Sequence, residues 1–365
     1  MISFAKIISS LSGTVTSSIT DKDIAALKEN FKALNYELSL LRYKESDDED
    51  IRLAIKYLKK RPYSAALFPY EKMREMPPIE VGTDKDLKMC YVMHNGHPLY
   101  FPKGESEKVV RWLYRYAIED DDVSGNGYRQ RNPHAYQSER YHIKEGDILI
   151  DAGGGKRLSP LDVMDDIVSL ITEAFSKRTR SEDLDVELDV GTPRGLFALD
   201  VMDKVSKVYV LERAYRWWKP LEATLAPYTD KVELVRGYLS GKKKKLEERK
   251  EKKKEKKNGK RIRLTNLLEQ CGQQRVFIVM DIEGKELEVL KDAQEYLKSA
   301  KNPITLAVCA YHHASDYEEL MSFFESIGYH TETQPGYIYT NMNEKPGIYS
   351  LRKCMIRASN IEVTA

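Results

Sequence analysis

The chain has 365 residues, of which 41% are hydrophobic and 32% charged, and its formal net charge is +2. This length predicts one large domain or two smaller ones with an ample core, and the composition is that of a globular protein. Apolar runs stay well short of the roughly 18 residues that cross a bilayer, and the four cysteines lack the spacing of a disulfide framework or zinc knuckle. We therefore expect a cytoplasmic protein with no membrane span.

The first part of the chain carries signals for helices and one hairpin. Residues 20–43 and 48–60 have the apolar spacing of amphipathic helices behind acidic or Thr/Asp starts, and residues 106–122 repeat that pattern. Between them, the dipeptide Asn95-Gly96 joins two β-rich runs, which is a strong hairpin signal. We predict an N-terminal helical and hairpin region over residues 1–142, placed to cover a substrate.

Short β-branched runs alternate with helical patterns from about residue 143 onward. Such alternation is typical of βαβ units with right-handed crossovers. For residues 143–365 we therefore predict an α/β fold with a doubly wound, mostly parallel sheet, interrupted by insertions at about 154–188 and 241–262. In sheets of this kind ligands bind at the carboxyl ends of the strands, so residues at strand ends are the candidates for a site.

A lysine-rich segment interrupts the second half of the chain. Residues 242–263 hold 14 Lys or Arg and 4 Glu, so the rest of the chain is acidic overall. Blocks of like charge usually form solvated, extended loops; the alternative is an arm that binds the phosphates of nucleic acid. No aromatic residue lies among the lysines to stack on bases, so we do not expect nucleic acid as a partner.

Two similar stretches compete for the centre of the site. "ILIDAGGG" at 148–155 precedes "PLDVMD", and "VELDVGTPRG" at 186–195 precedes "ALDVMD". A strand that ends in Asp and turns through glycines into a helix lets a ligand approach the backbone. The second stretch does this with Gly191 and Gly195, whereas the first has an arginine at the second glycine position. We therefore predict that the second stretch holds the site and that the first is displaced or pairs at its margin.

Glu212 strengthens this choice. It closes the strand "KVYVLE", 21 residues after Gly191. An acidic residue about 20 positions beyond a glycine turn is placed to accept hydrogen bonds from both hydroxyls of a ribose. The pattern fits either a nicotinamide cofactor or S-adenosylmethionine, and it also occurs as a plain βα turn.

Four motifs resemble those of the FkbM-family methyltransferases, which are S-adenosylmethionine-dependent enzymes. They are "DVGTPRGLFAL" at 189–199, "KVYVLE" at 207–212, "FIVMDIEGKELEVLKDA" at 277–293 and "AVCAYHHASDYEELMSFFESIGY" at 307–329. The resemblance covers roughly residues 143–358, and "VMDIEGKE" is its most specific part. It implies a Rossmann-like class I methyltransferase fold with a seven-stranded sheet.

The resemblance also implies roles for residues at the strand ends. The implied cofactor-binding residues are Asp189, Gly191, Gly195, Glu212 and Glu283. The implied catalytic residues are Asp281, His312 and His313. An imidazole with an ordinary pKa near 6.5 takes a proton from a hydroxyl, and the sequence does not say which of the two histidines points inward. The alternatives are a salt-bridged turn for Glu283 and a packed loop position for the histidines.

We therefore expect methyl transfer from S-adenosylmethionine to an oxygen of a small-molecule or glycan acceptor, the glycan, lipid and natural-product classes being those the resemblance implies. No metal is expected, because no second carboxylate or Asn cluster completes an oxygen-rich site with Asp281. The alternative is a non-catalytic binding or scaffold protein whose cofactor site the insertion at 154–188 disrupts. The sequence carries no signal for the oligomeric state.

Overall fold

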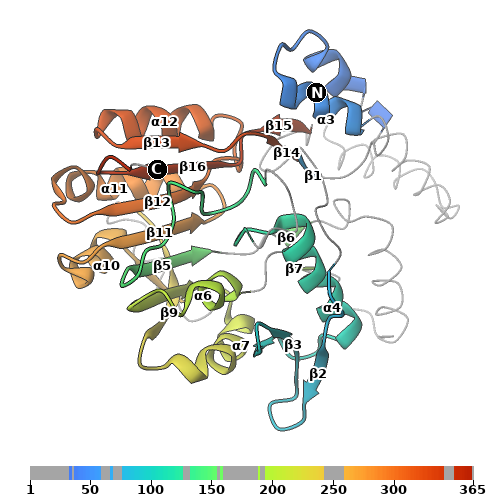
Figure 1. Cartoon of the computed structure of the whole chain (residues 1–365), viewed down its shortest axis with the longest axis vertical. Helices are drawn as coiled ribbons and strands as arrows, with labels where there is room; N and C mark the ends of the chain where they lie inside the picture. Colours follow the sequence, from blue (N-terminus) through green and yellow to red (C-terminus); the bar gives the residue numbers. More distant parts are fainter. Residues whose placement is uncertain are drawn as a thin grey trace, which may run out of the picture.

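Eight strands make up the main sheet of the computed structural model (Figure 1). Their bounds are β5 (Ile148–Gly153), β8 (Lys207–Glu212), β9 (Val232–Leu239), β10 (Lys260–Ile262), β11 (Val276–Asp281), β12 (Ile304–Cys309), β13 (His330–Thr333) and β16 (Met355–Ser359). They follow the order β10-β9-β8-β5-β11-β12-β16-β13, and β16 runs against the other seven. The predicted mostly parallel α/β fold is therefore confirmed.

The structure describes residues 33–34, 37–58, 66–68, 76–125, 132–153, 157–158, 188–189, 194–241, 259–340 and 349–363. The first part of the predicted helix at 20–43, most of the predicted insertion at 154–188 and the lysine-rich stretch 242–258 lie outside these residues. Among the helices that the structure describes, none is long and apolar enough to cross a membrane.

The sheet has one strand more than the predicted seven because β10 joins its edge. This strand follows the lysine-rich stretch and pairs in parallel with β9, with Lys260 opposite Gly237. The two backbones approach so closely that a Cβ at Gly237 would collide with the carbonyl oxygen of Lys260. The predicted insertion at 241–262 therefore ends inside the sheet.

Helices cover both faces of this sheet. On one face lie α6 (Leu196–Val201) and α7 (Tyr215–Leu225); on the other lie α10 (Leu264–Cys271), α11 (Glu286–Ser299) and α12 (Asp316–Ser326) (Figure 1). Alternate residues of β5 serve the two faces, since Leu149 belongs to one core cluster and Ile148 and Ile150 to the other. Strands buried on both faces have continuous apolar sequences, which explains the apolar runs in this part of the chain.

The chain makes a long excursion between β5 and α6. β6 (Arg157–Leu158) and β7 (Leu188–Asp189) form a separate antiparallel pair, in which Arg157 lies opposite Asp189. The prediction that 186–195 supplies the central strand is wrong, because 148–153 occupies the centre between β8 and β11. The first stretch supplies the strand and the second supplies the turn into the helix, so each of the two similar stretches forms one half of a strand–turn–helix unit.

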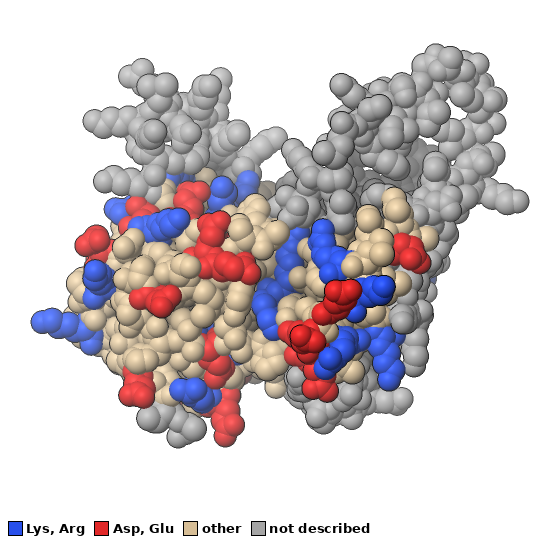
Figure 2. Space-filling model, turned by 90° about the horizontal axis from the view of Figure 1, so that it is seen from above, with Lys and Arg blue, Asp and Glu red and all other residues tan. Residues whose placement is uncertain are grey.

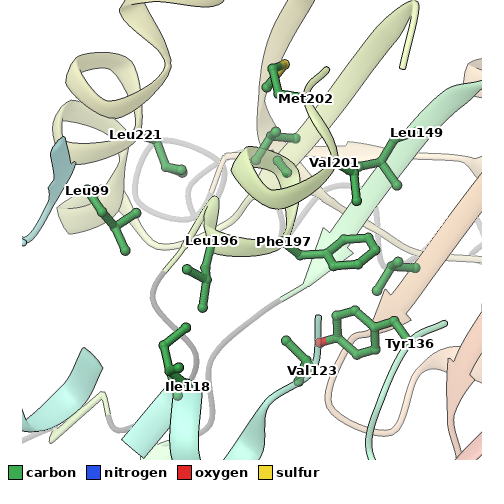
Figure 3. Packing of buried hydrophobic residues seen from close by; sticks show 14 of the residues in the cluster. Leu99, Ile118, Val123, Tyr136, Leu149, Leu196, Phe197, Val201, Met202 and Leu221 are labelled. Atoms are coloured by element: carbon green, nitrogen blue, oxygen red, sulfur yellow. The ribbon is translucent and has the colours of Figure 1, made fainter. Parts of the chain in front are cut away.

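A small antiparallel sheet in the N-terminal region packs against α6 and α7. It consists of β2 (Val81–Asp84), β3 (Met89–His94) and β4 (His97–Tyr100), and Asn95-Gly96 makes the predicted hairpin turn with positive φ at both residues. The predicted helix at 106–122 is observed as α4 (Glu107–Arg115) followed by η1 (Tyr116–Asp121). Figure 3 shows Leu99 of β4 and Ile118 of η1 around the same apolar cluster as Leu196 of α6.

A third sheet joins the N-terminal region to the C-terminal part of the chain. β1 (Ala66–Phe68), β14 (Tyr337–Thr340) and β15 (Ser350–Arg352) are antiparallel neighbours. The helix α3 (Glu49–Leu58), which matches the predicted helix at 48–60, buries Ala54 and Leu58 against Tyr337 and Tyr339. The first 142 residues thus contact the rest of the chain through this sheet and through the small sheet at α6 and α7. They also contact β16, because the guanidinium of Arg357 donates to the carbonyl oxygens of Ala135 and Tyr136.

Acidic and basic side chains are mixed over the described part of the face shown in Figure 2. Acidic and basic residues also form ion pairs in the described part of the chain, such as Lys207 with Glu233 and Arg263 with Asp292. A strong field of one sign is what attracts polyanions to a protein surface, and the mixed pattern on this face differs from such a field.

Candidate functional site

Three carboxylates gather at the carboxyl ends of three neighbouring strands. Asp151 lies in β5, Glu212 is the last residue of β8 and Asp281 is the last residue of β11. Strand β5 lies between the other two, with Asp151 opposite Val210 on one side and Val279 on the other. Ligands bind at this edge of parallel sheets, so the three carboxylates define the candidate site.

Arg194 brings a positive charge to these carboxylates. Its Nε atom lies 2.7 Å from Oε2 of Glu212, and only 10% and 2% of the two side chains are exposed. The guanidinium also lies over the ring of Trp217, 6.0 Å from its centroid. The backbone N–H of Ala214 donates to the other carboxylate oxygen of Glu212. Glu212 is therefore buried, with a charged or hydrogen-bonding neighbour at each oxygen.

The side chain of Asp151 is buried beside these charged groups. Burial raises the pKa of Asp151 to about 7, and the negative charges of Asp281 and Glu212 raise it too, whereas Arg194 opposes them. Near neutral pH the protonated and ionised forms therefore coexist. A carboxyl in this state either donates or accepts a hydrogen bond.

A second group of carboxylates surrounds the buried imidazole of His312. Its Nε2 atom lies 3.2 Å from Oδ1 of Asp281 and 3.8 Å from Oε2 of Glu283, and its Nδ1 atom lies 3.3 Å from Oε1 of Glu286. The ring of Tyr311 stacks on the imidazole with 4.5 Å between centroids. These residues meet because β11 and β12 are neighbours and their carboxyl ends lie at the same edge.

The carboxylates decide the charge of His312. Burial on its own would lower the pKa of His312, but the neighbouring carboxylates of Asp281 and Glu286 outweigh burial and raise the pKa to about 10. Burial would likewise raise the pKa of Asp281, and the neighbouring His312 holds that pKa below its ordinary value. At neutral pH the pair is an imidazolium and a carboxylate, so His312 is not in the neutral form that a general base needs.

The two adjacent histidines have different surroundings. His312 is fully buried in the site, whereas His313 is exposed. The backbone N–H of His313 donates to Oδ2 of Asp316 across 2.6 Å at the start of α12. Of the two predicted histidines, His312 is therefore the one that the structure places beside Asp281.

Two of the predicted cofactor residues lie at turns next to the site. Gly195 precedes α6 with a φ of +82°, a conformation that favours glycine, and a Cβ there would lie 3.0 Å from Cδ2 of Leu221. Glu283 has a φ of +61°, and 41% of its side chain is exposed.

The other two predicted turn residues are not placed in the site. Asp189 pairs with Arg157 in the separate two-stranded ladder, and Gly191 lies outside the described residues. Asp151 takes the position at the end of the central strand that the sequence prediction gave to Asp189.

Sequence reasoning missed three charged or titratable residues of the site: Arg194, Glu286 and His134. His134 is buried, with its Nε2 atom 3.5 Å from Sγ of Cys309 and its ring edge-on to Tyr311 at 5.3 Å. Its charge contributes to the lowered pKa of Asp281. A signal for Glu286 was present in "EGKE", and Arg194 lies beside Gly195 in the predicted cofactor turn, where its side chain was not considered. Nothing near His134 in the sequence points to the strand ends.

Two groups of side chains in the described part of the chain have the spacing of metal ligands. One comprises Asp281, Glu286 and His312, and the other comprises Asp281, Cys309 and His134; in each, the ligand atoms lie within 4.8 Å of one another. The expectation that no second carboxylate completes an oxygen-rich site with Asp281 is wrong. Glu286 lies beside Nδ1 of the same imidazole whose Nε2 faces Asp281. Sequence spacing hid this contact, since the imidazole that bridges the two acids comes from a different strand end.

Comparison with protein families gives one match. Residues 221–331 match the family described as "Methyltransferase FkbM domain", so the resemblance expected from the sequence is confirmed over this segment. The match includes Asp281, Glu286 and His312 and begins downstream of Asp151 and Glu212. The comparison with curated proteins finds no match.

Comparison with solved structures gives methyltransferases at low similarity. A methyltransferase FkbM from Methylobacillus flagellatus KT is 17% identical over 60% of this chain and 44% of its own, with a TM-score of 0.33. A precorrin-6y C5,15-methyltransferase from Geobacter metallireducens GS-15 is 13% identical over 60% of this chain and 82% of its own, with a TM-score of 0.30. This chain thus spans less than half the length of the first protein. The order and pairing of the strands in its own sheet define the α/β fold.

Proposed function

We propose that this chain, whose residues 221–331 match the Methyltransferase FkbM domain, is an S-adenosylmethionine-dependent methyltransferase. The cofactor would bind at the carboxyl edge of β8, β5 and β11. The methyl group would go to a hydroxyl oxygen of a glycan, lipid or natural-product acceptor. The observation that carries this proposal is the buried carboxylate of Glu212 at the end of β8, next to the central strand that carries Asp151.

The residues at this edge suit the chemistry of the cofactor. A carboxylate at the end of the strand next to the central one is placed to accept hydrogen bonds from two ribose hydroxyls, and Glu212 would do so. The strand β5 ends at Gly153, where a Cβ would lie 3.4 Å from Oδ1 of Asp151; glycine here leaves the backbone open to a ligand. Asp151 and Asp281 would give the sulfonium charge a negative environment.

This binding mode requires the contact between Arg194 and Glu212 to break. The guanidinium of Arg194 lies next to the carboxylate oxygen Oε2 of Glu212. Ribose hydroxyls would replace that contact, and the arginine would turn toward Asp151 or solvent. This exchange needs no movement of the sheet, because Arg194 belongs to the turn before α6.

The protein's part in the reaction is positioning and charge. S-adenosylmethionine supplies a methyl group that is already activated by its sulfonium, so the acceptor oxygen mainly has to lie in line with it. Asp281 would accept the hydrogen bond of the acceptor hydroxyl and orient its oxygen, and the proton would leave to solvent as the oxygen–carbon bond forms. His312, held as an imidazolium by Asp281 and Glu286, would fix the orientation of the Asp281 carboxylate.

Calorimetric titration of S-adenosylhomocysteine into the protein tests the proposal. The parent protein should bind one equivalent, and Glu212→Gln and Asp151→Asn should each weaken binding by about tenfold or more, which is the effect of losing a charge-assisted hydrogen bond. Glu233→Gln is the matched control, since Glu233 is an exposed carboxylate paired with Lys207 at the amino ends of β9 and β8, opposite the site. Folded parent protein that binds no S-adenosylhomocysteine would overturn the proposal and favour a non-catalytic role.

A further inference from the structure

Asp281, Glu286 and His312 come from three separate elements and converge on one point. Asp281 ends β11, Glu286 begins α11 and His312 follows β12. Each offers one ligand atom, and the three atoms lie within 4.8 Å of one another. We propose that this cluster is a binding site for a divalent metal ion, and that Mn²⁺ or a cation of similar preference occupies it.

The first support is an unsatisfied carboxylate. Glu286 is 2% exposed; its Oε1 atom accepts from the backbone N–H of Ile282 and faces His312, whereas its Oε2 atom is buried and has no hydrogen-bond partner. A buried, unpaired carboxylate oxygen is unfavourable because it has lost its water without gaining a partner. A cation in the cluster would supply that partner.

The second support is the spacing around the imidazole. One ligand atom from each of Asp281, Glu286 and His312 lies within 4.8 Å of the other two. Ligands that bind an octahedral cation at about 2.1 Å lie about 3.0 Å apart when adjacent and about 4.2 Å apart when opposite. Asp281 lies next to Nε2 and Glu286 next to Nδ1, so one of the two carboxylates would move toward the nitrogen that binds the metal.

The third support is the balance of charge. The carboxylates of Asp281 and Glu286 face the two different nitrogens of one buried imidazole. Negative charges that are brought together away from water are unfavourable. A divalent ion would bring the cluster close to neutrality while the imidazole binds as a neutral ligand.

The donor set narrows the choice of metal. Carboxylates suit Mg²⁺, Ca²⁺ and Mn²⁺, whereas imidazole suits transition metals, and Mn²⁺ accepts both. No cysteine belongs to this cluster, so the soft-ligand zinc or copper sites made by thiolates are not the pattern here. The partly exposed Glu283 lies on the open side, where water or an acceptor oxygen would complete the coordination.

The proposed metal site does not depend on methyl transfer. A catalytic use of the metal rests on the proposed function. If the proposed function holds, a cation held by Asp281, Glu286 and His312 would bind the acceptor oxygen and lower the pKa of its hydroxyl, so that the proton leaves to solvent as the methyl group arrives. In that state His312 would be a neutral ligand and no longer an imidazolium that orients Asp281. The metal would then select acceptors with two neighbouring oxygens able to chelate it.

The test is titration of Mn²⁺ into protein freed of metal with a chelator, with free Mn²⁺ measured by its electron paramagnetic resonance signal. The full chain should bind one Mn²⁺, and Glu286→Gln and His312→Gln should each weaken binding by at least about tenfold. Glu295→Gln, an exposed acid on the same helix α11, should bind as the parent does. Circular dichroism checks that each variant is folded. If Glu286→Gln or His312→Gln does not fold, Asp281→Asn, at a partly exposed position, is measured in its place.

Two results would overturn the metal site. One is folded parent protein that binds no Mn²⁺ at millimolar concentration, and the other is equal binding by the parent and the ligand variants. The same metal-free protein is titrated with S-adenosylhomocysteine in parallel. If the protein binds S-adenosylhomocysteine but not Mn²⁺, the metal site is rejected and the proposed function stands. If it binds Mn²⁺ but not S-adenosylhomocysteine, the proposed function is rejected and the metal site stands.

Discussion

The Nε atom of Arg194 lies 2.7 Å from Oε2 of Glu212, so an arginine from the turn before α6 holds the carboxylate that we propose for the ribose. Hydroxyls that donate to Glu212 have to compete with this guanidinium. Both side chains are buried, and charges interact more strongly where water is excluded. The ion pair therefore sets how readily the site accepts a ligand.

Replacing Arg194 with Met keeps much of its packing on Trp217 and removes its charge. We expect the free energy of unfolding to fall by about 3 kcal/mol or more, because Glu212 is left as an uncompensated buried charge. We expect S-adenosylhomocysteine to bind about tenfold more tightly, because its hydroxyls no longer compete with the arginine. Urea unfolding and calorimetric titration measure the two effects.

Arg213→Met is the control for this variant, since Arg213 follows Glu212 in the chain but its guanidinium lies over Tyr238, 5.3 Å from the ring centroid. It should leave both quantities close to those of the parent. If Arg194→Met folds and binds S-adenosylhomocysteine more weakly, the arginine holds the ligand and does not compete with it.

The sequence predicted most strands of the main sheet well, because each buried strand is a continuous apolar run. The strands that end at Glu212 and Asp281 appear where the sequence placed them. It failed at the choice between the two Asp-Gly stretches, since both carry an apolar run, an aspartate and a turn. Pairing with β8 and β11 decides that choice, and such contacts join residues far apart in the chain.

The candidate site shows the same division between local and long-range information. Glu212 and Asp281 were found from their positions at strand ends, which is a local signal. Arg194 and Glu286 were missed because their importance comes from the carboxylate or imidazole that each meets in the fold. Proximity of this kind depends on the strand order and on the excursion between β5 and α6.

The raised pKa of Asp151 predicts a pH dependence of stability. A carboxyl whose pKa is about 7 in the folded protein binds its proton more tightly there than in the unfolded chain, where the pKa is about 3.9. This contribution is complete below about pH 4 and is lost as the pH rises through about 7. Asp151→Asn removes it, so between pH 5 and 8 the variant should lose roughly 2 to 4 kcal/mol less unfolding free energy than the parent.

Urea unfolding of the parent and of Asp151→Asn at the two pH values measures this difference. Asp230→Asn, at an exposed turn position, should follow the parent. If the unfolding free energies of the parent and of Asp151→Asn change by the same amount between pH 5 and 8, the raised pKa of Asp151 is contradicted.

Gly195 combines a left-handed backbone with a close neighbour. Its φ is +82°, and a Cβ would lie 3.0 Å from Cδ2 of Leu221, whereas Gly328, after the end of α12, has a φ of +75° and open space around it. Gly328→Ala should lower the free energy of unfolding by about 1 kcal/mol from backbone strain. Gly195→Ala should lower it by clearly more, because it adds a steric contact to a similar strain. Equal effects in urea unfolding would mean that α7 yields at Leu221 without cost.

The N-terminal sheet is tied to α6 by a buried hydrogen-bonded chain. Oδ1 of Asp200 lies 2.6 Å from Nε2 of His94, whose Nδ1 lies 2.8 Å from the hydroxyl of Tyr114. The amide of Asn95 donates to the same oxygen of Asp200 across 3.1 Å. One carboxylate thus connects the hairpin and α4 to the helix that follows the turn at Gly195.

Asp200→Asn should therefore loosen the N-terminal region as well as lower stability. The charge-assisted bond to His94 is lost, which predicts a decrease of about 2 kcal/mol in the free energy of unfolding. Limited proteolysis should cut the segment between β2 and α4 faster in this variant than in Asp203→Asn, which changes an exposed residue of the same region. If both variants resist the protease as the parent does, the apolar contacts of Leu99 and Ile118 hold the N-terminal sheet without help from Asp200, and the hydrogen-bonded chain is dispensable.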